Sequence, residues 1–248
     1  IQGFANQYVE FNLEHPFLSD VRVRKALSYA TNRRALVDGL WQGRATLLNS
    51  PIHPVFWASK PDTTTFDNNI EEAKRLMAEA GYADGFSVTL HTLPAAHAQS
   101  AEIVKELLRE LNIEVNVIVE EIGTFAQRVG EGNFEWCGTA RGMRHDPTGY
   151  LNDFGRPHVG QAANWFAGGE GWKNDEIMEL FEAGAVNLDI PSRLQQFRRI
   201  QELVMEEAPH IYLVQNKKFH AVRSELKDMY VDYTDFLTGL RSSARLEA

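Results

Sequence analysis

The chain has 248 residues, and 44% of them are hydrophobic, which is enough for a sizeable buried core. Its formal net charge is -9, and the acidic residues form no tail, so a nucleic-acid backbone is disfavoured as a partner. The longest apolar runs are far too short to span a bilayer, so we expect no membrane span. Cys137 is the only cysteine, which excludes a disulfide framework and a cysteine zinc site. The sequence opens at Ile1 without a secretory signal, which we interpret as a removed signal or a piece of a longer chain.

The first part of the chain predicts one strand, two helices and a loop. Residues Gln7–Asn12 alternate apolar and polar side chains, as a strand with one buried face does. Asp20 precedes a stretch whose apolar residues recur on one helix face, and Asn32 can cap a second helix over Arg33–Trp41. The stretch Gly43–Asp67 is rich in proline and shows little periodicity, so we expect a long surface loop there.

The next part gives the clearest pattern. A helix over Ile70–Ala80 has an apolar face and ends at Gly81. The strand Phe86–Leu90, a helix over Val104–Leu111 and the strand Val115–Val119 then follow in succession. Strand, helix and strand in this order predict a βαβ unit with parallel strands and a right-handed crossover.

The alternation of helices and strands continues to the end of the chain. We predict a helix, a strand, two helices and a returning strand, at Thr124–Val129, Phe134–Ala140, Asp175–Ala185, Ser192–Glu207 and Ile211–Val214. The fold class is therefore α/β, with a sheet covered by helices.

Several catalytic and cofactor motifs are absent from the sequence. It has no G-x-S-x-G elbow, no Walker loop, no G-x-G-x-x-G after a strand and no H-E-x-x-H pair. His91 and His97 bracket a turn after a strand, a position typical of a solvated loop end. Cys137 falls inside a predicted strand, which favours a small buried hydrophobe over a nucleophile. We therefore expect no catalytic residues, no metal site and no cofactor.

Four stretches in order carry a resemblance to a known family. They are FNLEHPFLSDVRVRKAL at Phe11–Leu27 with the SYATNRRALVDGLWQG that follows it, IEEAKRLMAEAGYADGFSVTL at Ile70–Leu90, HDPTGYL at His145–Leu151 and RRIQELVMEEAPHIYL at Arg198–Leu213. The chain resembles the extracellular solute-binding proteins of family 5, the peptide-, dipeptide- and nickel-binding class served by ABC importers. The resemblance implies one lobe of a two-lobed type II periplasmic-binding-protein fold, with a mixed sheet flanked by helices. It also implies that residues 1–248 are the C-terminal lobe, with the C-terminal end returning to the missing lobe.

The same stretches have a plain structural interpretation. In VRVRKAL the apolar face packs on the sheet, and we expect Arg22, Arg24 and Lys25 to form a solvated face. Asp146 and Pro147 suit the cap and the first position of a helix. These residues are therefore expected to determine the fold more than to contact a ligand.

The resemblance places ligand contacts in the segment that leads to Asp146. In peptide-binding members an acidic residue lies three positions before this aspartate and a tryptophan three before that, but here the positions hold Met143 and Ala140. Arginine at 141 and 144 and a histidine at 145 make the segment cationic instead. Because a guanidinium pairs bidentately with carboxylate or phosphate, this departure favours a ligand with an anionic group, or a sugar conjugate.

Five candidates for ligand contact besides Met143 follow from this segment and from a later aromatic loop. They are Arg141, Arg144, His145, Asn164 and Trp165. A tryptophan face suits a sugar ring or an apolar side chain, and an asparagine amide suits hydroxyls or carbonyls. Solvated or structurally paired arginines and a tryptophan packed in the core are the competing interpretations.

The resemblance implies the solute-binding component of an ABC-type importer. Such a protein captures a peptide, an opine-like acid or a sugar conjugate by cleft closure, works with permease subunits and is periplasmic or extracellular. The alternatives are an α/β hydrolase or transferase, and a sensory or chaperone module that reuses the same lobe. Turnover of a bound ligand separates the enzyme from the receptor.

Overall fold

The computed structural model describes residues 5–54, 56–60, 62–142, 146–155, 174–217, 226–227 and 245–246. Its strands are β1 Ala5–Phe11, β2 Ala45–Leu47, β3 Ser87–Thr92, β4 Glu114–Val119, β5 Trp136–Gly142, β6 His210–Asn216, β7 Leu226–Lys227 and β8 Arg245–Leu246. Its α-helices are α1 Val21–Ala30, α2 Arg33–Ala35, α3 Ile70–Glu79, α4 Ala96–Leu108, α5 Ile122–Gly130, α6 Pro147–Gly155, α7 Asp175–Val186 and α8 Ile190–Glu207. Two short helices of other types are η1 Leu36–Leu40 and η2 Arg109–Leu111. None of the helices among the described residues combines the length and the apolar content that a membrane crossing needs.

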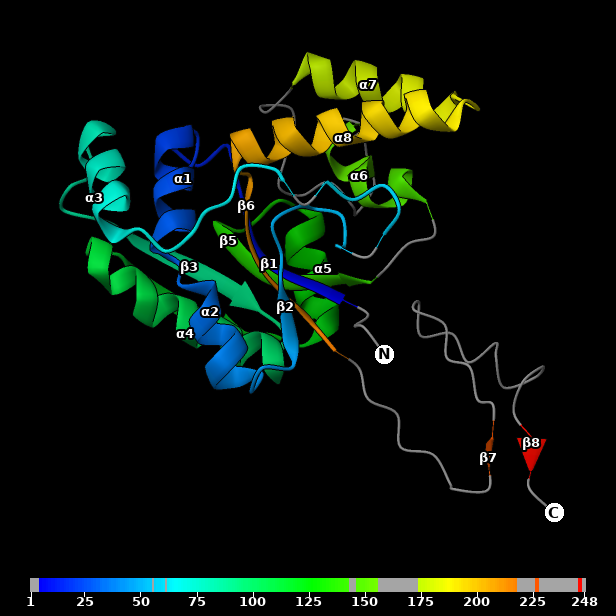
Figure 1. The fold of residues 1–248 in the computed structure, drawn as a ribbon. Coiled ribbons are helices and arrows are strands. Elements are labelled where there is room, and N and C mark those ends of the chain that lie inside the picture. Colours follow the sequence, from blue (N-terminus) through cyan, green and yellow to red (C-terminus); the bar gives the residue numbers. More distant parts are fainter. Residues whose placement is uncertain are drawn as a thin grey trace.

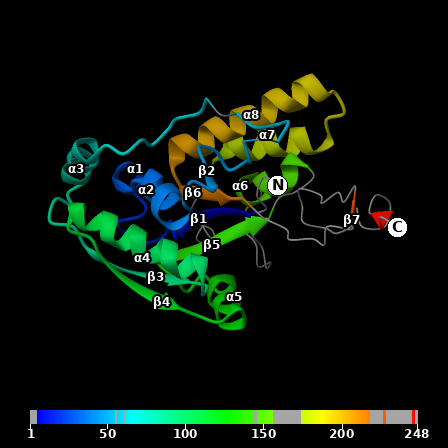
Figure 2. The same ribbon diagram turned by 60° about the horizontal axis from the view of Figure 1, so that its bottom comes forward.

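Six strands form one mixed sheet in the order β2-β6-β1-β5-β3-β4. β3 runs parallel to both β4 and β5, whereas β1 runs antiparallel to β5 and β6. Figure 2 shows β4 at one edge of this sheet. The parallel pairing of β3 with β4 through α4 confirms the predicted βαβ unit.

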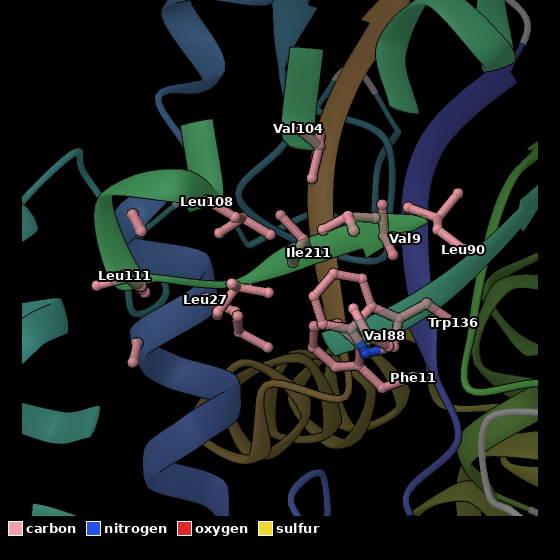
Figure 3. Packing of buried hydrophobic residues seen from close by; sticks show 14 of the residues in the cluster. Val9, Phe11, Leu27, Val88, Leu90, Val104, Leu108, Leu111, Trp136 and Ile211 are labelled. Carbon is pink, nitrogen blue, oxygen red and sulfur yellow. The ribbon is translucent and has the colours of Figure 1, made fainter. Parts of the chain in front are cut away.

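Alternate strand residues face two large hydrophobic cores, besides a small third cluster of Phe125, Val129, Phe134 and Cys137. On one face Phe11, Trp136 and Ile211 pack against α1, α3 and α4, as Figure 3 shows for part of this cluster. On the other face Tyr8 and Tyr212 pack against α6, α7 and α8, which together form the layer of helices seen in Figure 1. The mixed sheet flanked by helices is the predicted architecture.

Helix ends follow the capping residues. Asp20, Asn69 and Asp189 each accept a hydrogen bond from a first-turn amide of α1, α3 and α8. α8 therefore begins at Ile190, two residues before the predicted start, and it ends where Ala208 adopts a left-handed conformation just before proline. The predicted helix over 33–41 is two elements, because the α-helical turn α2 continues as the wider π-helix η1.

The segment 43–67 is not the predicted surface loop. It contains β2, which pairs with β6, and it buries Leu48, Ile52 and Phe66 in the second core. The physical reason is Arg33, whose buried guanidinium donates hydrogen bonds to the carbonyls of Leu48 and Phe66. A buried donor of this kind holds an irregular segment against the core without regular secondary structure.

The expected solvated face of α1 is only partly solvated. Arg22 is exposed and pairs with Asp20, but Arg24 is 2% exposed. Its guanidinium donates to the carbonyl oxygens of Glu207, at 2.8 and 2.9 Å, and of Leu18, at 2.7 Å. A buried arginine is stable here because backbone acceptors replace its water.

Candidate functional site

The strand directions gather several loops at one edge of the sheet. Since β3, β4, β5 and β6 run the same way, their carboxyl ends lie together with the amino end of β1. The segments that leave these ends lead into α4, α5 and α6. We call this the carboxyl edge. In α/β folds ligands bind beside such edges, so it is the candidate binding edge.

A row of buried amides lies beneath the carboxyl edge. Asn6 donates to the carbonyl of Pro51 at 3.2 Å and accepts from Gln215 at 3.4 Å. On the neighbouring residue, the side-chain oxygen of Gln7 accepts from the hydroxyl of Ser100 at 3.0 Å. All three amide side chains are at most 4% exposed. The row links β1 to β6, to α4 and to the 49–54 segment, so the base of the edge is rigid.

A small hollow lies next to this row, below the first turn of α4. Gln7, His97, Ser100 and Thr139 are among the residues that line it. It holds about 10 Å³, which is room for about one water and not for a solute. Burial lowers the pKa of His97, so this imidazole is neutral near pH 7 and offers no fixed positive charge. The hollow therefore belongs to the wall of the edge and not to a ligand cavity.

The start of α6 is held by charged contacts. As predicted, Asp146 caps the helix and Pro147 begins it, with the Asp146 carboxylate accepting from the Thr148 amide at 3.0 Å and hydroxyl at 2.7 Å. Arg193 of α8 donates to the same carboxylate at 2.9 Å and lies over the ring of Phe197. Burial acts to raise the pKa of Asp146, but hydrogen bonds from Thr148 and Arg193 outweigh it and hold that pKa below its ordinary value.

The predicted ligand-contact residues are only partly within the described structure. Arg141 lies on β5 opposite Asn6, with its backbone at the carboxyl edge. Its side chain lies outside what the structure describes, so its contact with a ligand stays a prediction. The other predicted contacts lie outside the described residues altogether: Met143, Arg144, His145, Asn164 and Trp165.

Cys137 and His91, which the sequence analysis also considered, lie in buried positions of the sheet. Cys137 is fully buried, as predicted, and its thiol donates to the carboxylate of Glu10 at 3.2 Å. The expectation of a solvated loop end is wrong for His91, which is 7% exposed and lies 3.4 Å from Glu120. His91 is the fifth residue of β3, which extends to Thr92, so it is a buried strand residue and not a loop end. Among the described residues, no group of three or more histidine, cysteine or acidic side chains could hold a metal ion.

The buried amide row was not predicted from the sequence. Polar residues at the first positions of a strand look like the end of a strand in sequence, and their partners lie far away along the chain. One available signal was the polar pair Asn6 and Gln7 at the start of an alternating strand.

Comparison with known proteins identifies the family. The model of the bacterial extracellular solute-binding proteins, family 5 Middle, matches residues 1–160. The dipeptide-binding protein of Escherichia coli is 24% identical over 242 residues, covering 93% of this chain and 44% of the relative. The heme-binding protein A of Haemophilus influenzae is 24% identical over 237 residues, covering 91% of this chain and 42% of the relative.

Solved structures share the fold. HbpA2 from Haemophilus parasuis matches all of this chain and 49% of its own, with a TM-score of 0.86 and 22% identity. The ABC transporter-associated periplasmic binding protein DppA from Helicobacter pylori, in complex with the peptide STSA, matches 99% of this chain and 48% of its own, with a TM-score of 0.83 and 21% identity. The predicted type II periplasmic-binding-protein fold is thus confirmed. The chain spans about half the length of the proteins it matches. It belongs to the bacterial extracellular solute-binding proteins of family 5.

Proposed function

We propose that this chain supplies most of the C-terminal lobe of a periplasmic or extracellular solute-binding protein that serves an ABC importer. The observation that carries the proposal is the carboxyl edge, where the ends of four parallel strands lie beside a buried amide row in a chain of this family. The opposite wall of the cleft would come from the rest of the protein. Closure of the two lobes on the solute would then be read by the permease subunits.

The function is binding without chemistry. The family consists of solute-binding proteins, which does not favour the hydrolase or transferase alternative. A receptor of this kind gains specificity from a few placed polar groups on a preformed wall. Incubation of the full-length protein with its tightest solute, followed by mass spectrometry, should return the solute unchanged.

The proposed solute carries an anionic group. Curated relatives include proteins named for dipeptides and for heme, so the family accommodates different solutes on one fold. In this chain the position of the family's acidic amine receptor is Met143, and arginines stand at 141 and 144. These cations favour a carboxylate-bearing peptide, an opine-like acid or an anionic sugar conjugate.

A thermal-shift screen of the full-length protein tests this choice. Peptides, opine-like acids, sugars and their uncharged amides or esters are compared at equal concentration, because binding to the native state raises its melting temperature. Anionic solutes should give the largest shifts, and blocking the anionic group should abolish them. A screen in which only neutral or cationic solutes bind would overturn the anionic preference while leaving the receptor function intact.

Arginine substitutions then locate the anion. Arg141→Ala or Arg144→Ala should weaken the best anionic solute by about two orders of magnitude, or about 2.7 kcal/mol. The melting temperature of the free protein should stay nearly unchanged. Arg75→Ala is the matched control, because Arg75 is exposed on α3 and pairs only with Glu72 and Glu79 among the contacts that the structure describes.

A further inference from the structure

β4 presents an open backbone edge. The amide of Glu114 donates to Phe86 O and that of Glu120 to Thr92 O, both at 2.9 Å, so the even-numbered residues of β4 bond toward β3. Because alternate residues of a strand bond to opposite sides, Val115, Val117 and Val119 direct their N–H and C=O groups outward. Within the part of the chain that the structure describes, no strand pairs with this side.

Within the described residues the open edge has no lysine, proline, bulge or covering segment, and Glu114 is its only charged residue. Natural edge strands carry lysine, proline or a bulge, or they are covered. β4 has the sequence EVNVIV, and its register with β3 runs over six residues without a shift. Ile118 is 37% exposed and Val119 is 52% exposed. A regular, apolar edge of this kind is a template for another strand.

The two halves of the edge differ in character. Beside the amino half lies a groove of about 560 Å³, lined by Lys105, Arg109, Asn112 and 113–116. The carboxyl half carries exposed Ile118 and Val119 and is followed by the exposed acid Glu121. One half is therefore a groove with a basic end, and the other is an apolar strand with an acidic end.

We propose that β4 pairs antiparallel with β4 of a second copy of this chain, about a two-fold axis at Asn116. A two-fold axis makes such an interface self-complementary, so each carboxyl half lies along the amino half and groove of the other copy. In this register Val115 faces Val117 of the partner subunit, and both of these residues have outward N–H and C=O groups. Glu121 of the partner subunit then reaches the basic end of the groove.

The charges favour the register with its axis at Asn116 over the register with its axis at Val117. An axis at Val117 would set Glu114 opposite Glu120 of the partner subunit, and like charges directly opposed are destabilising. The axis at Asn116 sets Glu114 opposite Ile118 and brings Glu121 near Arg109. Arg109 is 65% exposed and contacts Glu106, three residues earlier in α4, at 2.9 Å. Exposed pairs of this kind are weak, so Arg109 can exchange partners.

Charge reversal in the full-length protein tests the pairing. Sedimentation over a concentration series should show a monomer–dimer equilibrium. Arg109→Glu and Glu121→Arg should each weaken dimerisation about tenfold, since each contact occurs twice per dimer. The double variant should restore the original dissociation constant. Arg75→Glu, an exposed reversal on α3, is the control and should leave the equilibrium unchanged.

Hydrogen exchange distinguishes pairing with a second copy from coverage of the edge by another segment of the same chain. In the dimer the outward amides of Val115, Val117 and Val119 should be protected, and in Glu121→Arg they should exchange fast at the same concentration. A monomer in which these amides are protected would show that another segment of the same chain covers the edge, and it would overturn the proposal. A monomer with fast exchange, or a dimer indifferent to both reversals, would overturn it as well.

Discussion

Arg33 should contribute more to stability than any exposed arginine of the chain. Its side chain is 6% exposed, and its guanidinium donates to Phe66 O and to Asn49 Oδ1, both at 2.9 Å, and also to Leu48 O. Burial lowers the pKa of Arg33, with a nearby Asp67 acting in the opposite direction. The side chain thus joins the 43–67 segment to α2 through three acceptors of that segment.

Replacing Arg33 by alanine leaves at least two buried carbonyl oxygens without their donor. Each unsatisfied group costs about 1–3 kcal/mol, so Arg33→Ala should lower the free energy of unfolding by about 4 kcal/mol. Arg33→Lys keeps the charge but replaces a planar fork by one ammonium, which cannot reach all the acceptors, so about half of the loss is expected. The neighbour Arg34 is exposed, and Arg34→Ala should cost less than about 0.5 kcal/mol.

Urea unfolding followed by circular dichroism measures these losses. The transition midpoint should fall in the order Arg34→Ala, Arg33→Lys, Arg33→Ala while the slope stays constant, because the same surface is exposed on unfolding. A loss below about 1 kcal/mol for Arg33→Ala would refute the reasoning. It would mean that water replaces the guanidinium and that the 43–67 segment does not depend on it.

Three further predictions concern pH, a backbone position and the start of α6. Burial lowers the pKa of His53 to about 4, so as the pH falls the imidazole is protonated in the unfolded chain before it is protonated in the folded chain. The free energy of unfolding should therefore fall by about 3 kcal/mol between about pH 6.5 and about pH 4. In His53→Gln, urea titrations should show a smaller dependence of this free energy on pH. Gly85 has φ +74°, and a Cβ there would lie 2.0 Å from Asn112 O, so Gly85→Ala should cost about 2 kcal/mol or more in thermal unfolding. Asp146→Ala should lower the free energy of unfolding by about 1–2 kcal/mol. In the double variant this loss should not add to the loss caused by Arg193→Met, because the two side chains share one contact. Full additivity in a double-mutant cycle would contradict this.

The sequence predicted the regular elements because their signals are local. The alternation around Val88 lies within β3 and the apolar face of 104–111 lies within the continuous helical stretch of α4 and η2, and together they gave the parallel βαβ unit. The cap at Asp146 was predictable for the same reason, since the capped amide is two residues away. The start of α8 shifted from Ser192 to Ile190, because the cap at Asp189 and not the hydrophobic period decided it, whereas its end before Pro209 was predicted correctly.

Buried polar groups could not be predicted, because their partners are distant in sequence. Arg24 is satisfied by a carbonyl 183 residues away, and Gln215 donates to an amide 209 residues away. In a single sequence both residues look like members of a solvated surface. The 43–67 segment was misjudged in the same way, since its burial depends on a donor outside it and not on its own periodicity.

The contrast between the amide row and the loops above it has a functional consequence. Asn6 takes part in two hydrogen bonds that join β1 to β6 and to Pro51, so a change there would shift three elements at once. On either side of residues 143–145 the chain is held at Gly142, which pairs with Ala5 in the sheet, and at Asp146, which contacts Thr148 and Arg193. Substitutions within that segment leave those end contacts in place. We therefore expect substitutions of Arg141 or Arg144 to change the selectivity for the bound anion without loss of the fold, above a base that stays constant.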